Sequence, residues 1–376
     1  MIQQATRRPR TSAVESDFFA GRLIRWQLVY GRHSLPWQGI SDPYAIWISE
    51  IMLQQTQVST VIPYYERFMT VFPNIAPLAS APVEEVLTLW SGLGYYSRGR
   101  NLHRTARMIM EQYGGAFPQD IATLQRLPGI GRSTAAAIAA FAFGKRCTIL
   151  DGNVKRILIR YFGVNGHPGE RMIEEQLWQL AEGLLPVEED HKTIASYTQA
   201  LMDLGALVCV RTQPRCEHCP LQADCYAYQN DLTAVLPAPK PRKTPPVKEI
   251  VHLILLNQGR ILLKKRPASG IWGGLWCFPE TSIDEDSVDY CKKNLHLQVL
   301  KFAVLPHLQH TFTHFKLIIQ PQLLQSIMYL PECEENSEEN DFLWMTIEEA
   351  LQRAIPAPVR KLLLMTQPLL QSCVHE

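Results

Sequence analysis

The segment from Leu127 to Val154, LPGIGRSTAAAIAAFAFGKRCTILDGNV, constrains the fold of this chain more than any other. Gly129 and Gly131 frame a turn that we expect to pass through positive φ and to bring backbone N–H groups close to a partner. An Ala-rich helix over 132–143 follows, and its small side chains allow another helix to pack closely. Asp151 then starts a further helix, where a carboxylate is stabilised. Such a turn binds anions, phosphate above all, although the spacing alone fits a helix joint with a capping aspartate equally well.

Apolar residues recur with helical spacing through the first part of the chain, so the region 17–208 is predicted to be mainly helical. The expected helices span 17–30, 44–55, 58–71, 82–90, 101–113, 132–143, 153–161, 170–184 and 191–208. Ser16 is the expected cap of the first helix. Residues 1–16 are polar and basic, lack the apolar core of a signal peptide and are expected to form a disordered arm. Because no run of 18 apolar residues occurs, we expect no membrane contact and a cytoplasmic location.

Proline and basic residues gather in 229–248, which predicts a stiff extended linker. Beyond it the apolar period changes to that of strands. Residues 249–256 and 260–265 alternate around Asn257-Gln258-Gly259, a hairpin pattern. Further strands are expected at 300–305 and 312–320, and helices at 286–295 and 347–353. Residues 249–376 are therefore predicted to form a separate α+β domain.

Charge is unevenly distributed although the net formal charge is only +1. Residues 1–160 carry 18 Lys and Arg against 10 Asp and Glu, a balance of +8, and residues 161–230 carry 4 against 10, a balance of −6. A basic first part suits a polyanionic partner whose binding salt would weaken.

Four of the nine cysteines gather in the loop 209–228, as Cys209, Cys216, Cys219 and Cys225. Four thiolates in one compact loop bind a soft metal ion or a metal–sulfur cluster, and the spacing alone leaves iron–sulfur and zinc open. An odd number of cysteines without an export signal argues against a disulfide framework. The other five cysteines are interpreted as packing or surface thiols.

The LPGIG hairpin near 127–138, an Asp some twenty residues later and the four-cysteine loop together resemble the helix-hairpin-helix DNA glycosylases of the endonuclease III superfamily. The resemblance covers residues 17–228. The stretches SEIMLQQTQV at 49–58, GLGYYSR at 92–98 and LDGNV at 150–154 narrow it to the MutY-type adenine DNA glycosylases. That family excises adenine mispaired with 8-oxoguanine, and its C-terminal domain is similar to Nudix hydrolases. The implied architecture is a mainly α glycosylase region with an iron–sulfur loop, followed by a Nudix-like lesion-recognition domain.

Glycosidic bond cleavage needs an acid at the base and negative charge near the sugar. Glu50 lies in the apolar context WISEIML, where burial would raise its pKa and keep it protonated. Asp151, at a helix start, is expected to stay ionised. The resemblance implies that Glu50 protonates adenine N7 and then handles the water, with Asn153 polarising nearby groups. Without the motif, Glu50 would be interpreted as a solvated helix residue.

The resemblance also assigns contacts with DNA. Tyr95, Gln54 and Gln55 match positions that contact the opposite base or fill the gap left by the extruded one, and Trp37 matches a wall of the base pocket; residue type alone favours core packing for Tyr95 and equally allows it for Trp37. Gly129 and Gly131 would present amides to a phosphate. Phe312, Thr313 and His314 match an element that senses 8-oxoguanine, with Thr in place of Ser.

The implied cofactor is one [4Fe-4S] cluster held by the four cysteines, and the resemblance allows a monovalent cation at the hairpin. The implied partner is double-stranded DNA with adenine opposite 8-oxoguanine or guanine, bound by a monomer associated with the nucleoid. One alternative is a bifunctional glycosylase and lyase, but Ser133 occupies the position where such enzymes carry their lysine nucleophile, although Lys155 lies nearby. The others are a nucleotide pyrophosphohydrolase, which the missing glutamate cluster after Gly274 opposes, and a non-catalytic DNA-binding module.

Overall fold

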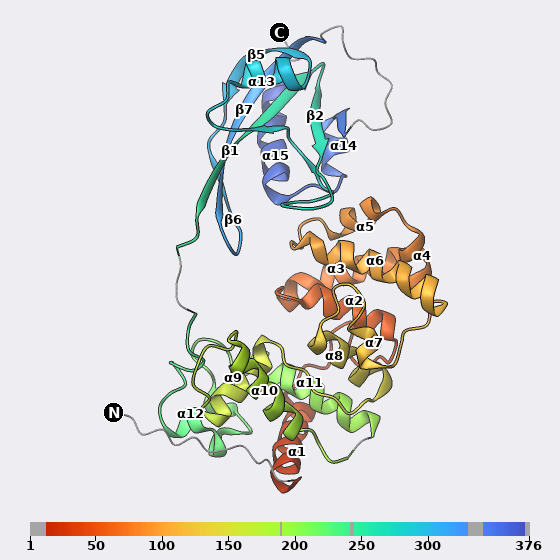
Figure 1. Ribbon diagram of the computed structural model, residues 1–376, viewed down its shortest axis with the longest axis vertical. Coiled ribbons are helices and arrows are strands. Elements are labelled where there is room, and N and C mark those ends of the chain that lie inside the picture. Colours follow the sequence, from red (N-terminus) through yellow and green to blue (C-terminus); the bar gives the residue numbers. More distant parts are fainter. Residues whose placement is uncertain (1–12, 189, 241–243, 330–340, 373–376) are drawn as a thin grey trace. The chain divides into compact units, whose positions relative to one another are not determined.

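The computed structural model describes residues 13–188, 190–240, 244–329 and 341–372 (Figure 1). The chain divides into two compact units. Unit 1 comprises the described residues of Met1–Ser80 and Asn101–Pro241, and unit 2 comprises those of Ala81–Arg100 and Arg242–Glu376. The sequence pattern did not predict that the segment Ala81–Arg100 would belong to unit 2. No helix in the described ranges is both long and apolar enough to cross a membrane.

Unit 1 is helical, as predicted. Its elements are α1 (Ala13–Tyr30), α2 (Pro43–Leu53), α3 (Val58–Val71), α4 (Ile75–Ser80), α7 (Ile121–Leu124), α8 (Arg132–Phe143), α9 (Gly152–Phe162), α10 (Arg171–Gly183), α11 (His191–Leu207), η1 (Cys216–His218), η2 (Gln222–Asp224) and α12 (Tyr226–Gln229), together with most of α6 (Tyr96–Tyr113). The expected bounds of α3 and α8 are confirmed to the residue.

The predicted start of the first helix is wrong. Helix α1 begins at Ala13, so Ser16 lies inside it as a buried residue and does not cap it. Residues 1–12, which make up most of the expected disordered arm, lie outside the described residues. The preceding Ala-Val-Glu residues contain no helix breaker, which lets the helix start one turn earlier.

The core of unit 1 is formed where α1, α9, α10 and α11 meet. Phe19, Leu23, Ile157, Leu180 and Leu204 are among its buried side chains. Each fully buried Leu or Phe contributes about 1.5–3 kcal/mol relative to an exposed one. This packing fixes the start of α9, and with it the position of Asp151.

The hairpin between α7 and α8 confirms one glycine expectation and corrects the other. Gly129 has φ +81°, and a Cβ there would come within 3.0 Å of Asn101 Cβ, so both backbone and space require glycine. Gly131 instead has φ −83° in the extended N-cap position of α8, and a Cβ there would meet no described atom within 4 Å. The turn therefore needs one left-handed residue and not two.

Unit 2 combines α5 (Val83–Trp90) and the start of α6 with an α+β domain. Its strands are β1 (Val247–Asn257), β2 (Arg260–Lys265), β3 (Trp276–Cys277), β4 (Glu280–Thr281), β5 (Leu297–Val304), β6 (Leu308–Thr311), β7 (Lys316–Tyr329) and β8 (Phe342–Met345), and its other helices are α13 (Ser287–Asn294), α14 (Ile347–Leu351) and α15 (Ala357–Ser372). All eight strands form one sheet whose main path is β3-β2-β1-β7-β5, and β1 and β7 run parallel.

The expected β1–β2 hairpin is confirmed. Asn257 pairs with Arg260, and Gln258 and Gly259 both have positive φ, which is the geometry of a tight two-residue turn. The strand expected over 312–320 is wrong at its start, because β7 begins at Lys316. Residues 312–315 form a turn between β6 and β7, closed by the Phe312 N–H donating to the Phe315 carbonyl at 2.9 Å.

Candidate active site

A cavity of about 490 Å³ opens in unit 1 between the loop after α1 and helices α2 and α11. Its lining includes Trp37 and Glu50, which the sequence predicted as pocket wall and acid. Leu35, Ile46, Leu53, Val58, Phe141 and Met202 give it an apolar surface, and Arg32, Gln38, Ser49 and Gln199 add polar groups. An apolar cleft with a few converging polar groups is typical of a site for a small molecule.

Glu50 is the acidic side chain of this cavity. It lies near the end of α2, whose other face is buried through Trp47, Ile48, Ile51 and Met52. Burial raises the pKa of Glu50 to about 8, and the nearby charge of Asp151 adds to this increase. The carboxyl group is therefore largely protonated at neutral pH, the direction that its apolar sequence context predicted.

Asp151 caps α9, as predicted, by accepting the Val154 N–H at 2.8 Å. Burial raises its pKa, although the N–H groups of Val154 and Asn153 and the charges of Arg156 and Lys155 act in the opposite direction. The expectation that the helix start alone would hold Asp151 ionised therefore omitted a larger opposing effect. The two carboxyl groups interact because the charge of Asp151 contributes to the raised pKa of Glu50.

Asn153 is positioned by its neighbours and does not point freely into solvent. Arg156 donates to Asn153 Oδ1 at 2.8 Å and also to the carbonyl oxygens of Gly205 and Cys209. Gly205 of α11 is required here, because a Cβ at that position would lie 2.5 Å from Asn153 Cβ. The close approach of α11 to the start of α9 therefore depends on a glycine.

The sequence did not predict that Asp203 would hold two residues of the cavity lining in place. Asp203 is completely buried in α11 and accepts hydrogen bonds from the Arg32 backbone N–H at 2.9 Å, from Arg32 Nε at 2.7 Å and from Gln199 Nε2 at 2.9 Å. A buried carboxylate with three donors fixes both lining side chains. One sequence signal was available, since Asp203 interrupts the otherwise apolar run Leu201–Ala206.

The hairpin and the cavity-lining helix are joined by Gln54. Its side-chain amide lies 3.4 Å from the Gly129 carbonyl oxygen and 3.3 Å from Thr134 Oγ1. Gln55, the next residue, is exposed and has φ +56°. The first turn of α8 leaves backbone N–H groups without intrahelical partners, which suits the predicted phosphate contact of Gly129 and Gly131.

Ser133 has a structural partner. Its hydroxyl accepts the Leu150 N–H at 3.0 Å and so ties α8 to the residue before Asp151. Lys155, the lysine nearest in sequence to Asp151, forms an ion pair with Glu174 at 2.6 Å. The Ser133 contact therefore stabilises the chain just before Asp151, and the ion pair of Lys155 stabilises α9.

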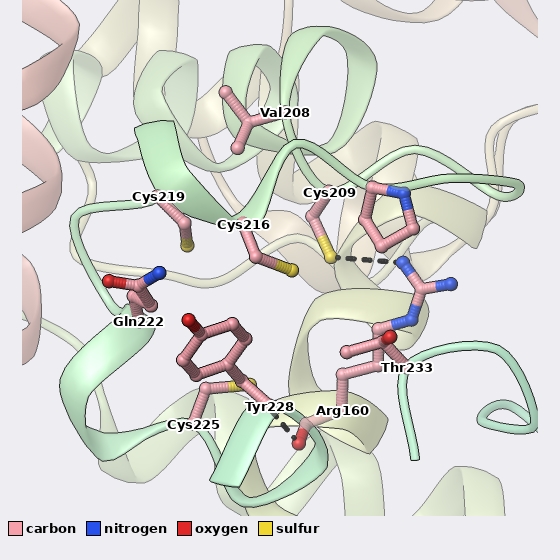
Figure 2. A pocket seen from close by; sticks show the side chains of 10 residues that line it. Arg160, Val208, Cys209, Cys216, Cys219, Gln222, Cys225, Tyr228 and Thr233 are labelled. Atoms are coloured by element: carbon pink, nitrogen blue, oxygen red, sulfur yellow. Dashed lines mark hydrogen bonds between the residues drawn. The ribbon is translucent and has the colours of Figure 1, made fainter. Parts of the chain in front are cut away.

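The four predicted cysteine ligands line one cavity of about 310 Å³ (Figure 2). Figure 2 shows the sulfur atoms of Cys209, Cys216, Cys219 and Cys225 directed towards the same space, with Tyr228 beside them. Arg160 NH1 lies 3.4 Å from Cys209 Sγ, which places a positive charge next to a sulfur. Among the described residues, no three His, Cys, Asp or Glu side chains are arranged to hold a single metal ion.

Four thiolates in one cavity can hold a single zinc ion or a cluster with several metal ions. Zinc held by four thiolates at about 2.3 Å draws the sulfur atoms together around one small centre. An iron–sulfur cluster instead separates its four ligands around several metal ions. Burial raises the pKa of Cys219 to about 12, so its thiolate form needs a nearby positive charge.

Tyr95 belongs to unit 2. Its side chain is 43% exposed and its backbone has φ +48°, so the core packing that its residue type favours is not observed. The Arg98 guanidinium lies 5.4 Å from the Tyr95 ring centroid and 5.5 Å from that of Trp90. Tyr95 is thus an exposed aromatic residue that contacts Arg98 and has a strained backbone.

The turn of Phe312, Thr313 and His314 also lies in unit 2. Thr313 and His314 are exposed, and Thr313 Oγ1 lies 3.4 Å from His314 Nδ1. The Phe312 ring stacks on Phe315 with centroids 4.4 Å apart and contacts Trp272 at 5.5 Å. The aromatic support presents the two polar side chains outward.

Helix α13 is the first helix of unit 2 after Gly274. Asp286 caps it by accepting the Val288 N–H and also pairs with Lys301 at 2.8 Å. Residues 287–294 contain Asp289, Lys292 and Lys293 but no glutamate.

Two family models match separate parts of the chain, and the first of them includes Ala81–Arg100, which the structure assigns to unit 2. Residues 48–182 match the family model of the HhH-GPD superfamily base excision DNA repair proteins, and residues 251–365 match that of the NUDIX domain. A solved structure of a thermostable thymine-DNA glycosylase is 28% identical, with a TM-score of 0.52, and covers 58% of this chain and 100% of that one.

Two curated relatives match most of this chain. A protein named adenine DNA glycosylase from Buchnera aphidicola subsp. Baizongia pistaciae is 39% identical over 346 residues, which cover 92% of this chain and 95% of the relative. One of the same name from Mus musculus is 34% identical over 403 residues, covering 91% of this chain and 76% of the relative.

Proposed function

This chain belongs to the adenine DNA glycosylases, and from this premise we propose that it is a monofunctional enzyme that removes adenine paired with 8-oxoguanine or guanine. The observation that carries the proposal is Glu50, a carboxyl group with a pKa of about 8 in an apolar cavity beside the charge of Asp151. The cavity would receive the adenine after the nucleotide leaves the duplex, at a cost of a few kcal/mol.

The proposed reaction uses the two carboxyl groups differently. Glu50 donates its proton to adenine N7 as the bond between C1′ and N9 breaks and its electron pair moves onto the base. Asp151 stabilises the positive charge that develops on the sugar. The Glu50 carboxylate then accepts a proton from the water that adds to C1′, which leaves free adenine and an abasic site.

Polar groups around the cavity support recognition of a purine. Gln38 Nε2 is buried without a hydrogen-bond partner among the described residues, and Gln38 lines the cavity. A buried donor without a partner costs about 1–3 kcal/mol, which a bound base could offset by accepting from it. Arg32 and Gln199, fixed by Asp203, add further donors.

Binding to the duplex would use features of both units. The hairpin at Gly129 would hold a phosphate, while Gln54, Gln55 and Tyr95 would contact the bases left in the stack. The exposed Thr313 and His314 would read 8-oxoguanine. Ser133 and Lys155 support the monofunctional assignment, since Ser133 holds the Leu150 N–H and Lys155 is paired with Glu174. The protein would act on DNA as a monomer.

Cys209, Cys216, Cys219 and Cys225 would hold one [4Fe-4S] cluster. Such a cluster would join η1, η2 and the end of α11 into one stable loop, and its role here is structural. The charge of Arg160 beside Cys209 would partly neutralise the bound thiolates. A monovalent cation at the hairpin carbonyls is a further element of the proposal.

The test compares three duplexes on one preparation under single-turnover conditions: adenine opposite 8-oxoguanine, adenine opposite guanine, and an oxidised pyrimidine opposite guanine. We expect free adenine from the first two, faster from the first, and no release from the third. Strand breaks should appear only after alkali treatment. Strand cleavage without alkali, as fast as base release, would establish the bifunctional alternative, and no release from any duplex would leave a DNA-binding module.

A further inference from the structure

Glu84 connects the segment Ala81–Arg100 to the C-terminal part of unit 2. It lies in the first turn of α5 and accepts three hydrogen bonds. Trp276 Nε1 donates at 2.6 Å, Lys265 Nζ at 2.9 Å and Arg353 NH1 at 3.4 Å. One carboxylate thus gathers donors from β3, β2 and the residues after α14.

Two of the three donors lie on strands of the sheet, and the third, Arg353, follows α14. Lys265 and Trp276 are register partners in the antiparallel pair of β2 and β3. The Trp276 backbone N–H donates to the Ala354 carbonyl at 2.9 Å, which fixes the residue next to Arg353. The receptor for Glu84 is therefore preformed.

A second set of contacts holds the far end of the segment. Ser91 Oγ donates to the Ile355 carbonyl at 2.9 Å, and Tyr96 OH lies 3.4 Å from the same oxygen. Arg100 NH1 donates to the Gly273 carbonyl at 2.6 Å. These contacts stand on both sides of Tyr95 in the chain, so the loop that carries Tyr95 is attached at both ends.

Contacts within the segment also link α5 to the loop that carries Tyr95. Trp90, at the end of α5, donates through Nε1 to the Gly94 carbonyl at 3.1 Å. The Arg98 N–H donates to the Tyr95 carbonyl at 2.8 Å, and its guanidinium lies over both Trp90 and Tyr95. A displacement of α5 would therefore move the Tyr95 backbone.

The electrostatics favour a charged Glu84. Burial by itself would raise the pKa of Glu84, but the hydrogen bonds from Trp276 and Lys265, together with the charges of Lys265 and Arg353, hold it below its ordinary value. Its side chain is only 24% exposed. Removing the charge leaves two cations facing a neutral group, which weakens the attachment.

We propose that Glu84 is a positioning residue that attaches Ala81–Arg100 to the C-terminal domain and thereby sets the position of Tyr95. The preference for 8-oxoguanine over guanine then depends on Glu84, although Glu84 contacts no nucleotide. This inference rests on the proposed function for Tyr95, and its structural half stands on the contacts of unit 2 alone.

The test uses Glu84→Gln, which keeps the shape of the side chain and removes its charge. Glu85→Gln is the matched control, because Glu85 is an exposed residue in the same helical turn. Hydrogen–deuterium exchange is measured for peptides covering 83–96, and single-turnover adenine release is measured opposite 8-oxoguanine and opposite guanine. Trp276→Phe removes one donor and serves as a second variant should Glu84→Gln fail to fold.

We expect faster exchange in 83–96 for Glu84→Gln, and a ratio of the two release rates lowered by about threefold or more. Glu85→Gln should match the wild type in both readouts. The double variant Glu84→Gln with Trp276→Phe should show a smaller effect than the sum of the single variants, because both weaken the same attachment.

Unchanged exchange in Glu84→Gln would overturn the attachment, and faster exchange with an unchanged rate ratio would overturn the positioning role. Failure of the proposed function is a separate outcome. In that case the wild type would release no adenine, and the proposed role of Glu84 in base preference would be wrong. The exchange data would still decide whether Glu84 attaches the segment.

Discussion

At the scale of single residues, the two carboxyl groups near the cavity are governed by different environments. Burial and the charge of Asp151 both raise the pKa of Glu50, which reaches about 8. Burial also raises the pKa of Asp151, but two backbone N–H groups and two cations act to lower it. The sequence predicted the Glu50 effect from its apolar neighbours, whereas the burial of Asp151 depends on contacts between distant helices.

A second buried ionisable residue gives a stability prediction. His252 on β1 is completely buried beside Trp272 and Phe278, and neither ring nitrogen has a hydrogen-bond partner among the described residues. Burial lowers its pKa from 6.5 to about 4, with the charge of Glu280 acting in the opposite direction. Between these pH values the unfolded chain binds a proton that the folded chain does not, so the stability of unit 2 falls as the pH falls.

His252→Phe is therefore expected to raise the free energy of unfolding by about 1 kcal/mol or more at mildly acidic pH, because it removes two unpaired polar atoms and the titration. Denaturant unfolding at neutral and mildly acidic pH measures the effect. The exposed His307 provides the control variant His307→Phe. Equal loss of stability on acidification in wild type and His252→Phe would show that His252 is not the responsible group.

At the scale of elements, helices with strong local signals were predictable and turns stabilised by tertiary contacts were not. Helix α8 begins after a glycine turn and ends at Gly144 in the left-handed conformation, and both signals are local. Residues 312–315 include the Phe and Thr side chains that are typical of strands, yet the stacking of Phe312 on Phe315 accompanies a turn. That contact could not be anticipated from a period-two pattern.

The hairpin provides a prediction at this scale. Gly129→Ala should destabilise unit 1 by about 1–2 kcal/mol, because its backbone has φ +81° and the new Cβ would meet Asn101 at 3.0 Å. It should also weaken binding of duplex DNA. Gly131→Ala is the matched control, since that position has φ −83° and open space.

Thermal unfolding measures the stability of the two variants, and duplex titration measures their affinity for DNA. A large loss for Gly129→Ala with a small change for Gly131→Ala is the expected result. Equal effects of the two variants would mean that the left-handed backbone at Gly129 is not what the hairpin requires.

At the scale of the whole molecule, contacts between residues far apart in the chain determine what the sequence could not show. The ion pair of Arg32 with Asp203 joins residues 171 positions apart, and the Ser91–Ile355 bond joins residues 264 apart. Composition and period predicted two domains of different class. They did not predict that Ala81–Arg100 would join unit 2.

The four-cysteine loop gives a prediction about metal removal. Purified protein should contain about four iron atoms per chain and absorb visible light. Removal of the iron, or Cys225→Ser, should expose 209–228 to proteolysis, because burial and mutual repulsion disfavour four free thiolates there. Cys147→Ser, which alters a cysteine outside the loop, is the control. A colourless protein with bound zinc and full activity would contradict the iron–sulfur assignment.

The central claim is that a protonated Glu50 delivers the proton that releases adenine. The most direct measurement is the pH dependence of the single-turnover rate of adenine release opposite 8-oxoguanine, for the wild type and for Glu50→Gln. The account predicts a wild-type rate that falls as the pH rises through about 8, and a Glu50→Gln variant that still binds the duplex but releases no adenine. A wild-type rate that stays constant through this range, or adenine release by Glu50→Gln at the wild-type rate, would contradict it.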